Sequence, residues 1–181
     1  ATFSGATRNT SEVRIWRPDA AEARAAASPG AWDRCAEAAL ATDWLFAVAP
    51  PDGRDGLALA APDRILVAPA GKRHLTEAYG LLKSLSQMQP EAHWWILLMG
   101  LTDAERGSLM MQAITETARR FLDLAPSYLA GVPRDAKLDQ STRALRAVVH
   151  YAPACPAATA IRAAADNLAR HTRPLAAPEA R

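Results

Sequence analysis

The sequence is poor in cysteine, lysine and long apolar runs, and each scarcity excludes a class of protein. Its two cysteines, Cys35 and Cys155, are too few for a disulfide framework and are not spaced as zinc ligands. Its apolar runs fall far short of the roughly 20 residues that span a bilayer. With 21 Lys and Arg against 19 Asp and Glu, the chain is nearly neutral, unlike a typical nucleic-acid-binding domain. We therefore expect a reduced, cytoplasmic protein that does not bind nucleic acid.

The common catalytic motifs are also missing. Gly71-Lys72 invites comparison with a phosphate-binding loop, but that motif needs glycine where Leu66 stands and serine or threonine where Arg73 stands. No serine lies in a G-x-S-x-G elbow. None of the four histidines has a second histidine or a cysteine at metal-ligand spacing. From the chemistry alone we predict no catalytic group and no metal site.

What the sequence does contain is a series of continuous apolar runs bounded by proline or glycine. The strongest are residues 44–48, 64–68 and 94–99. Runs without period-2 alternation are expected for strands of a parallel sheet that helices cover on both faces. Shorter candidate strands are residues 13–16, 128–130 and 147–150.

Between these runs, apolar residues recur at helical spacing. The pattern predicts helices over residues 75–85, with Thr76 as N-cap, over residues 104–122, with Phe121 on the buried face, and from Pro156 onward, with Ile161, Ala165 and Leu168 inward. Alanine-rich segments predict two short helices at residues 19–27 and 31–41. The alternation predicts an α/β fold, a mostly parallel, doubly wound sheet flanked by helices. We expect one domain over residues 12–171, a flexible segment at 1–11 and a disordered tail at 172–181.

Several segments, taken in order, resemble a known superfamily. They include DWLFAVAPPDG (43–53), LTEAY (75–79), AGVPRD (130–135) and CPA (155–157), and the order is kept over about residues 43–169. Together they resemble the MinD/ParA superfamily of deviant P-loop ATPases, and within it the FlhG/FleN regulators of flagellar number. The resemblance implies a P-loop NTPase-like fold. It also implies contacts with a nucleotide at Pro50, Gly53, Pro133 and Asp135.

Departures from the family pattern point to a loss of catalysis. The phosphate loop of the family has no counterpart in this chain. By the resemblance, Val48 stands where the family has its switch aspartate, and Met99 where it has the asparagine that reads adenine. Lost phosphate-binding groups cost several kcal/mol of transition-state stabilisation each, on the order of the values measured for oxyanion donors. We therefore expect a degenerate, non-hydrolysing module that needs no cofactor.

Such a module would act through protein contacts. We expect a partner from flagellar or another polar or envelope assembly, and a homodimer is a further expectation. Three arginines near the last predicted strand, Arg134, Arg143 and Arg146, are the candidate partner surface; a solvated face is an equally good interpretation. Pro174 and Pro178 interrupt the tail, so we expect no membrane anchor there.

Two other interpretations stay open. The chain could be the C-terminal part of an active MinD/FlhG-type ATPase that uses ATP and magnesium and has its phosphate loop outside this chain. The sequence does not begin with methionine, which leaves room for that interpretation. The other is a small-molecule enzyme that uses the loops PPDGRD (50–55) and PAGKRH (69–74), although no catalytic constellation can be assembled from them.

Overall fold

The computed structural model describes residues 7–8, 14–15, 44–49 and 61–171. A small antiparallel pair joins β1 (Thr7–Arg8) and β2 (Arg14–Ile15). The second of these lies within the predicted strand at residues 13–16, and the first lies within the segment that was expected to be flexible. The predicted helices at 19–27 and 31–41 and the tail at 172–181 lie outside the described residues.

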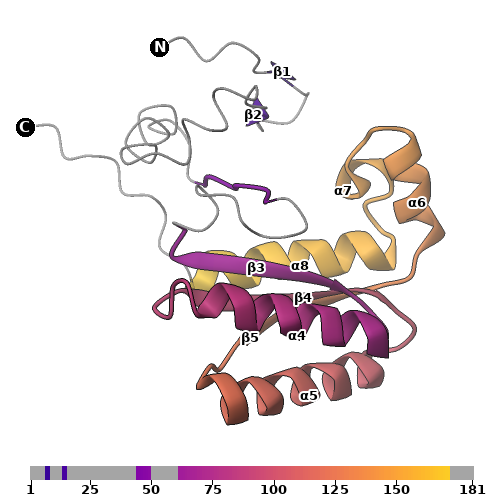
Figure 1. Ribbon diagram of the computed structural model, residues 1–181. Coiled ribbons are helices and arrows are strands. Elements are labelled where there is room, and N and C mark those ends of the chain that lie inside the picture. The colour runs from indigo at the N-terminus through magenta and orange to yellow at the C-terminus, as the bar shows by residue number, and fades with distance from the viewer. Residues whose placement is uncertain (1–6, 9–13, 16–43, 50–60, 172–181) are drawn as a thin grey trace, which may run out of the picture.

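The main sheet has three parallel strands in the order β3-β4-β5. They are β3 (Asp63–Pro69), β4 (His93–Leu101) and β5 (Ser127–Pro133). Connections of βαβ type run through α4 (Lys72–Ser86) and α5 (Ala104–Leu122), and the chain continues through α6 (Ala136–Arg143), α7 (Val148–Tyr151) and α8 (Pro156–His171). Figure 1 shows α4 and α5 on one face of the sheet and α8 on the other. This arrangement confirms the predicted α/β fold class.

Both faces of the sheet are apolar because both are covered. Ile96 and Leu98 of β4 point into the larger core with Leu82 of α4, and all three are fully buried. On the opposite face, Trp95 packs in a smaller core with Leu168 of α8. A strand that faces two cores needs apolar side chains at successive positions, which explains why the sequence shows an unbroken run here.

The predicted strand at residues 44–48 is wrong. Residues 44–49 form no strand, and the side chains of Phe46 and Val48 are 63% and 95% exposed. Trp44 packs against the smaller core, and the Phe46 ring stacks with it at a centroid distance of 6.1 Å. An apolar run indicates a preference for burial, but a strand also needs a neighbour with which to exchange hydrogen bonds.

The predicted strand at residues 147–150 is also wrong, because this segment is the short helix α7. The Tyr151 N–H donates to the Ala147 carbonyl at 2.9 Å, and Val148 is buried. A four-residue apolar run has too little periodicity to separate a strand from one helical turn.

Three further details differ from expectation. Thr76 does not cap α4, because the helix begins at Lys72 and the Thr76 hydroxyl bonds back to the Lys72 carbonyl. Gly100 does not end β4; it lies inside the strand at a φ of 77°. Phe121 and Ala165 are exposed rather than buried.

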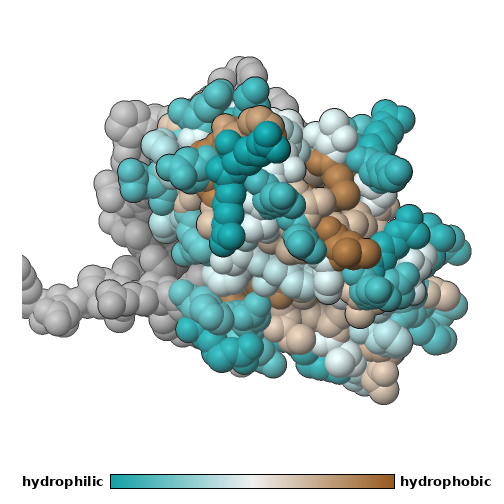
Figure 2. All heavy atoms as spheres, turned by 90° about the horizontal axis from the view of Figure 1, so that it is seen from below, coloured by the Kyte–Doolittle hydropathy of each residue, from teal (hydrophilic) through white to brown (hydrophobic). Residues whose placement is uncertain are grey.

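The outer surface of α4 and α5 mixes hydrophilic and hydrophobic side chains. Seen from below (Figure 2), the hydrophobic groups on this face are interspersed among hydrophilic ones. Leu109 and Phe121 of α5 are exposed apolar residues, and the Arg120 guanidinium lies over the Phe121 ring. Among the described residues, no helix is both long enough and apolar enough to cross a bilayer.

Candidate functional site

The three parallel strands end at one edge of the sheet, where α4, α5 and α6 begin (Figure 1). The start of α8 reaches the same edge, because the Ala157 N–H donates to the Asp135 carboxylate there. In open α/β sheets, ligands bind beyond the carboxyl ends of the strands. The candidate site is therefore built from the loops at residues 70–71, 102–103 and 134–135.

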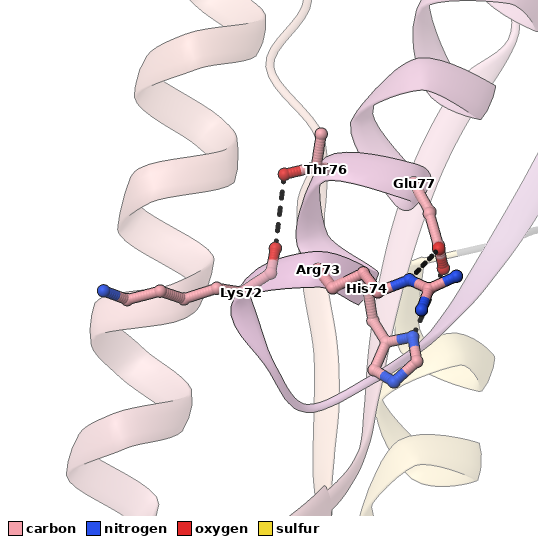
Figure 3. Close-up of polar contacts among 5 residues, drawn as sticks. All are labelled: Lys72, Arg73, His74, Thr76 and Glu77. Atoms are coloured by element: carbon pink, nitrogen blue, oxygen red, sulfur yellow. Dashed lines mark hydrogen bonds and ion pairs between the residues drawn. The ribbon is translucent and has the colours of Figure 1, made fainter.

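The first of these loops places basic side chains at the start of α4. Gly71 precedes the helix with a φ of 149°, and its carbonyl accepts the first intrahelical bond, from the Leu75 N–H at 3.0 Å. Glu77 accepts a hydrogen bond from the Arg73 Nε at 2.9 Å, and its other oxygen lies 3.3 Å from the His74 Nδ1 (Figure 3). Figure 3 shows Lys72 pointing away from this group.

Those contacts fix the charge of the α4 start. The hydrogen bond from Arg73, and then the one from His74, hold the pKa of the Glu77 carboxyl below its usual value. Glu77 therefore stays ionised and offsets the charge of one of its basic neighbours, while the Lys72 side chain points away from it (Figure 3). The result is a local excess of positive charge at a helix N-terminus.

The second loop caps α5 with an aspartate. Asp103 accepts the Arg106 N–H at 2.6 Å and the Thr102 hydroxyl at 3.0 Å. These hydrogen bonds, led by the one from Arg106, lower the pKa of the Asp103 carboxyl. The side chain behaves as an N-cap, which satisfies a backbone N–H that the helix itself cannot.

The third loop contains the carboxylate that the resemblance assigned to nucleotide contact. Asp135 accepts the Lys137 N–H at 2.8 Å through one oxygen and the Ala157 N–H at 3.1 Å through the other. It therefore caps α6 and also holds the first turn of α8. The bond from Ala157, followed by that from Lys137, lowers the pKa of Asp135. Pro133 lies two residues before it, at the end of β5.

Cys155 completes this junction. Its Sγ accepts the Ala158 N–H at 3.4 Å, and its carbonyl accepts the Thr159 N–H. Cys155 therefore caps α8, which begins at Pro156. The junction of α6 and α8 is thus held by side chains from residues 135 and 155.

In chemical terms the edge offers basic side chains and occupied carboxylates. Lys72, Arg73 and Arg134 are exposed, whereas Asp103 and Asp135 already accept backbone N–H groups. In residues 61–171 and the shorter described segments, no three His, Cys, Asp or Glu side chains are grouped to hold a metal ion. Pro50 and Gly53, predicted from the resemblance to contact nucleotide, lie outside the described residues.

The other two predicted partner residues frame a tip between α6 and α7. We call residues 143–146 the α6–α7 tip; Arg143, Leu145 and Arg146 are all exposed there. The Leu145 N–H donates to the Thr142 carbonyl at 3.1 Å, and the Arg146 N–H donates to the Ser141 carbonyl at 3.0 Å. This pair of bonds is a Schellman motif, in which the residue at the Leu145 position is usually glycine.

Leu145 was not singled out from the sequence, although the helix end lacks the usual glycine. Its φ is 52°, and 87% of its surface is exposed. The left-handed conformation costs a residue with a Cβ about 1–2 kcal/mol. Asp123 adopts the same conformation at the end of α5, but aspartate tolerates it better than leucine does.

The sheet and its flanking helices define the class of this domain. A three-stranded parallel sheet flanked by helices is consistent with a P-loop-like α/β domain. No protein-family model matches the chain. The antiactivator FleN of Pseudomonas aeruginosa is 27% identical over 109 residues, which cover 60% of this chain and 39% of FleN. The similarity supports a MinD/ParA-like relationship, and the chain spans about two fifths of the length of FleN.

Asp135 caps two helices through its ionised carboxylate, so we expect the stability of the protein to depend on pH in the acidic range. In the folded protein the pKa of the Asp135 carboxyl is lowered from its ordinary value of 3.8. Its contribution to the free energy of unfolding is therefore complete above pH 3.8 and is lost as the pH falls through the folded pKa. Asp135→Asn should lower the unfolding midpoint at pH 7. When the pH is then lowered to acidic values, the midpoint of this variant should fall less than that of the unmodified chain. Urea unfolding followed by circular dichroism at a series of pH values measures both effects.

Two variants serve as controls for Asp135. Asp103→Asn removes a cap from one helix, so it should cost less than Asp135→Asn, which weakens contacts to two helices. Asp166→Asn changes an exposed residue of α8 and should leave the unfolding midpoint at pH 7 unchanged. Equal midpoints for Asp135→Asn and Asp166→Asn would show that the two hydrogen bonds contribute nothing.

Proposed function

We propose that the chain is a MinD/FlhG-like regulatory module that acts through protein contacts and does not hydrolyse ATP. One observation carries the proposal: the carboxylates that follow β4 and β5, Asp103 and Asp135, are used as helix caps. Phosphoryl transfer needs groups that hold Mg²⁺ and orient the attacking water. A carboxylate whose oxygens accept helix N–H groups is less available for either task.

Two positions that the resemblance aligns with family functional groups support the proposal. Val48, aligned with the switch aspartate, has no group that can coordinate a metal. Met99, aligned with the adenine-reading asparagine, lies in β4 opposite Val132. Its thioether is a weak acceptor and no donor, so it cannot reproduce the paired hydrogen bonds of an amide.

The expected partner is another protein. The printed name of the similar Pseudomonas protein describes an antiactivator, and opposing an activator is a task that protein contact can perform. We propose that the partner of this chain is a component of flagellar or another polar or envelope assembly. The two proteins would meet in the cytoplasm, and the chain would need no cofactor. The arginines Arg134, Arg143 and Arg146 would contribute to the partner surface, with a homodimer as a further proposal.

The second candidate is the C-terminal part of an active ATPase. Two observations favour it: the match spans only 39% of FleN, and the start of α4 is basic. In that case a phosphate loop outside this chain would grip ATP and Mg²⁺, with Pro50, Gly53, Pro133 and Asp135 beside the nucleotide.

ATP turnover separates the two candidates. With Mg²⁺ present, we expect no phosphate release by this chain above the rate in buffer, and no binding of ATP by calorimetry at micromolar concentration. The same assay on the protein encoded by the whole reading frame should also show no turnover. Magnesium-dependent phosphate release by either protein would favour the ATPase and contradict the proposed function.

A further inference from the structure

The α6–α7 tip combines an exposed apolar side chain with a local excess of positive charge. Leu145 is 87% exposed and stands between Arg143 and Arg146. Residues 140–151 contain no Asp or Glu; Asp135 caps the start of α6, and Asp139 lies four residues before Arg143 in the same helix. The tip therefore presents one apolar group inside a basic rim.

Folding alone does not account for leucine at this position. Its side chain contributes little to either core, and its left-handed backbone conformation is one that glycine adopts without strain. A strained residue whose side chain is exposed is a reasonable place to look for function. Contact with another molecule would give the Leu145 side chain the burial that it lacks in this fold.

Contacts made by the residues beside the α6–α7 tip hold it in place. Val148 of α7 is buried, and the Ser141 hydroxyl, also buried, donates to the Leu138 carbonyl at 2.8 Å. The Arg146 guanidinium lies over the Tyr151 ring, 5.9 Å from its centroid. A group fixed in place before binding loses less entropy when it binds, so Leu145 is well suited to be an anchor.

We propose that the α6–α7 tip docks an acidic amphipathic helix of a partner protein. Leu145 inserts between apolar side chains of that helix, and Arg143 and Arg146 pair with its carboxylates. The choice of partner rests on charge complementarity, because a basic rim around one apolar anchor matches an acidic rim around an apolar stripe. This inference rests on the proposed protein-binding function and specifies its ligand.

The test is a selection from a displayed library of peptides of about 16 residues, roughly four helical turns. The unmodified chain is the bait, and a variant carrying Leu145→Gly, Arg143→Ala and Arg146→Ala is used for counter-selection. Enriched peptides should be rich in Asp and Glu, with apolar residues at i, i+3, i+4 and i+7. A lack of enrichment, or enrichment of basic or uncharged peptides, would overturn the proposal.

Point variants then test the anchor with a selected peptide, using fluorescence anisotropy. Leu145→Gly should weaken binding by about tenfold or more, as expected for loss of an apolar hot spot. Its melting temperature should be unchanged or higher, because glycine relieves the left-handed strain. Leu145→Met keeps an apolar side chain and should retain most of the binding. Unchanged affinity in Leu145→Gly would refute the role of the anchor.

The matched control is Phe121→Ala on α5. Phe121 is also exposed and lies beside an arginine, since the Arg120 guanidinium is 5.3 Å from its ring centroid. Its replacement should not affect peptide binding. Equal loss in Phe121→Ala and Leu145→Gly would show that the peptide binds exposed apolar groups without selecting the tip.

Competition experiments distinguish this ligand from other acidic surfaces. A duplex DNA oligonucleotide and vesicles of phosphatidylserine should fail to displace the peptide at physiological salt. Displacement by either would reassign the tip to that surface and overturn the proposal. ATP turnover with intact peptide binding would contradict the proposed non-hydrolysing function while leaving the docking site in place.

Discussion

Leu82→Ala is expected to lower the free energy of unfolding by about 2–5 kcal/mol, the range observed for large-to-small changes in a core. Leu82 lies on α4 and has no exposed surface. It belongs to the core in which α4 and α5 meet the sheet, together with Ile96 and Leu98. Truncation would remove buried apolar area and also leave a cavity, because neighbours on two helices and the sheet can relax only partly.

Urea unfolding monitored by circular dichroism measures this loss. Leu109→Ala is the matched control, because Leu109 is also a helical leucine but is 60% exposed. Its replacement should change stability by no more than about 0.5 kcal/mol. Similar losses in the two variants would mean that the core between α4, α5 and the sheet is not packed as described.

Gly131→Ala is expected to destabilise the protein by about 1–3 kcal/mol, the usual cost of overpacking. A Cβ at Gly131 would overlap the Leu101 Cδ1 and the Tyr128 hydroxyl oxygen. Gly131 lies in β5, opposite Leu98 of β4, so its backbone has little freedom to move away. The two side chains must shift instead, and that shift disturbs the end of β4.

A second substitution tests the cause of this loss. Tyr128→Phe removes the hydroxyl that the new Cβ would meet, so Gly131→Ala should cost less in that background. The control is Gly80→Ala on α4, where an added Cβ meets no atom within 4 Å. It should be neutral or stabilise by up to about 1 kcal/mol, since alanine favours helix. A Gly131→Ala protein as stable as the unmodified chain would contradict the described packing.

Local sequence determined the elements whose signals are complete within the segment. The helix predicted over residues 104–122 was found with those bounds, because Asp103 provides an N-cap and Met110, Ile114 and Ala118 repeat at helical spacing. The apolar runs at 64–68 and 94–99 were found as strands, each slightly longer than predicted. In these segments the hydrophobic pattern and the capping residues agree.

The wrong predictions concern segments whose state depends on distant neighbours. Residues 44–48 have a strand-like composition, yet the described segment forms no strand and exposes Val48. Ala165 was predicted on the buried face of α8, but Ala164 is buried instead. The contact surface of the sheet decides which of two adjacent small residues is covered, and the sequence pattern does not record it.

The candidate site was only partly predictable for the same reason. The resemblance drew attention to Asp135, and the sequence around it indicates a helix start. Its second hydrogen bond goes to Ala157, which is 22 residues away. No local pattern predicts such a bond. Leu145 was missed because nothing in a sequence states that a leucine will occupy a left-handed position.

Asp135 joins the two ends of the segment that contains the α6–α7 tip. The segment from Asp135 to Ala157 leaves and returns to the same carboxylate. The Asn167 amide, further along α8, donates to the Leu129 carbonyl at 3.2 Å. The two ends of this segment are therefore fixed beside each other at the edge of the sheet.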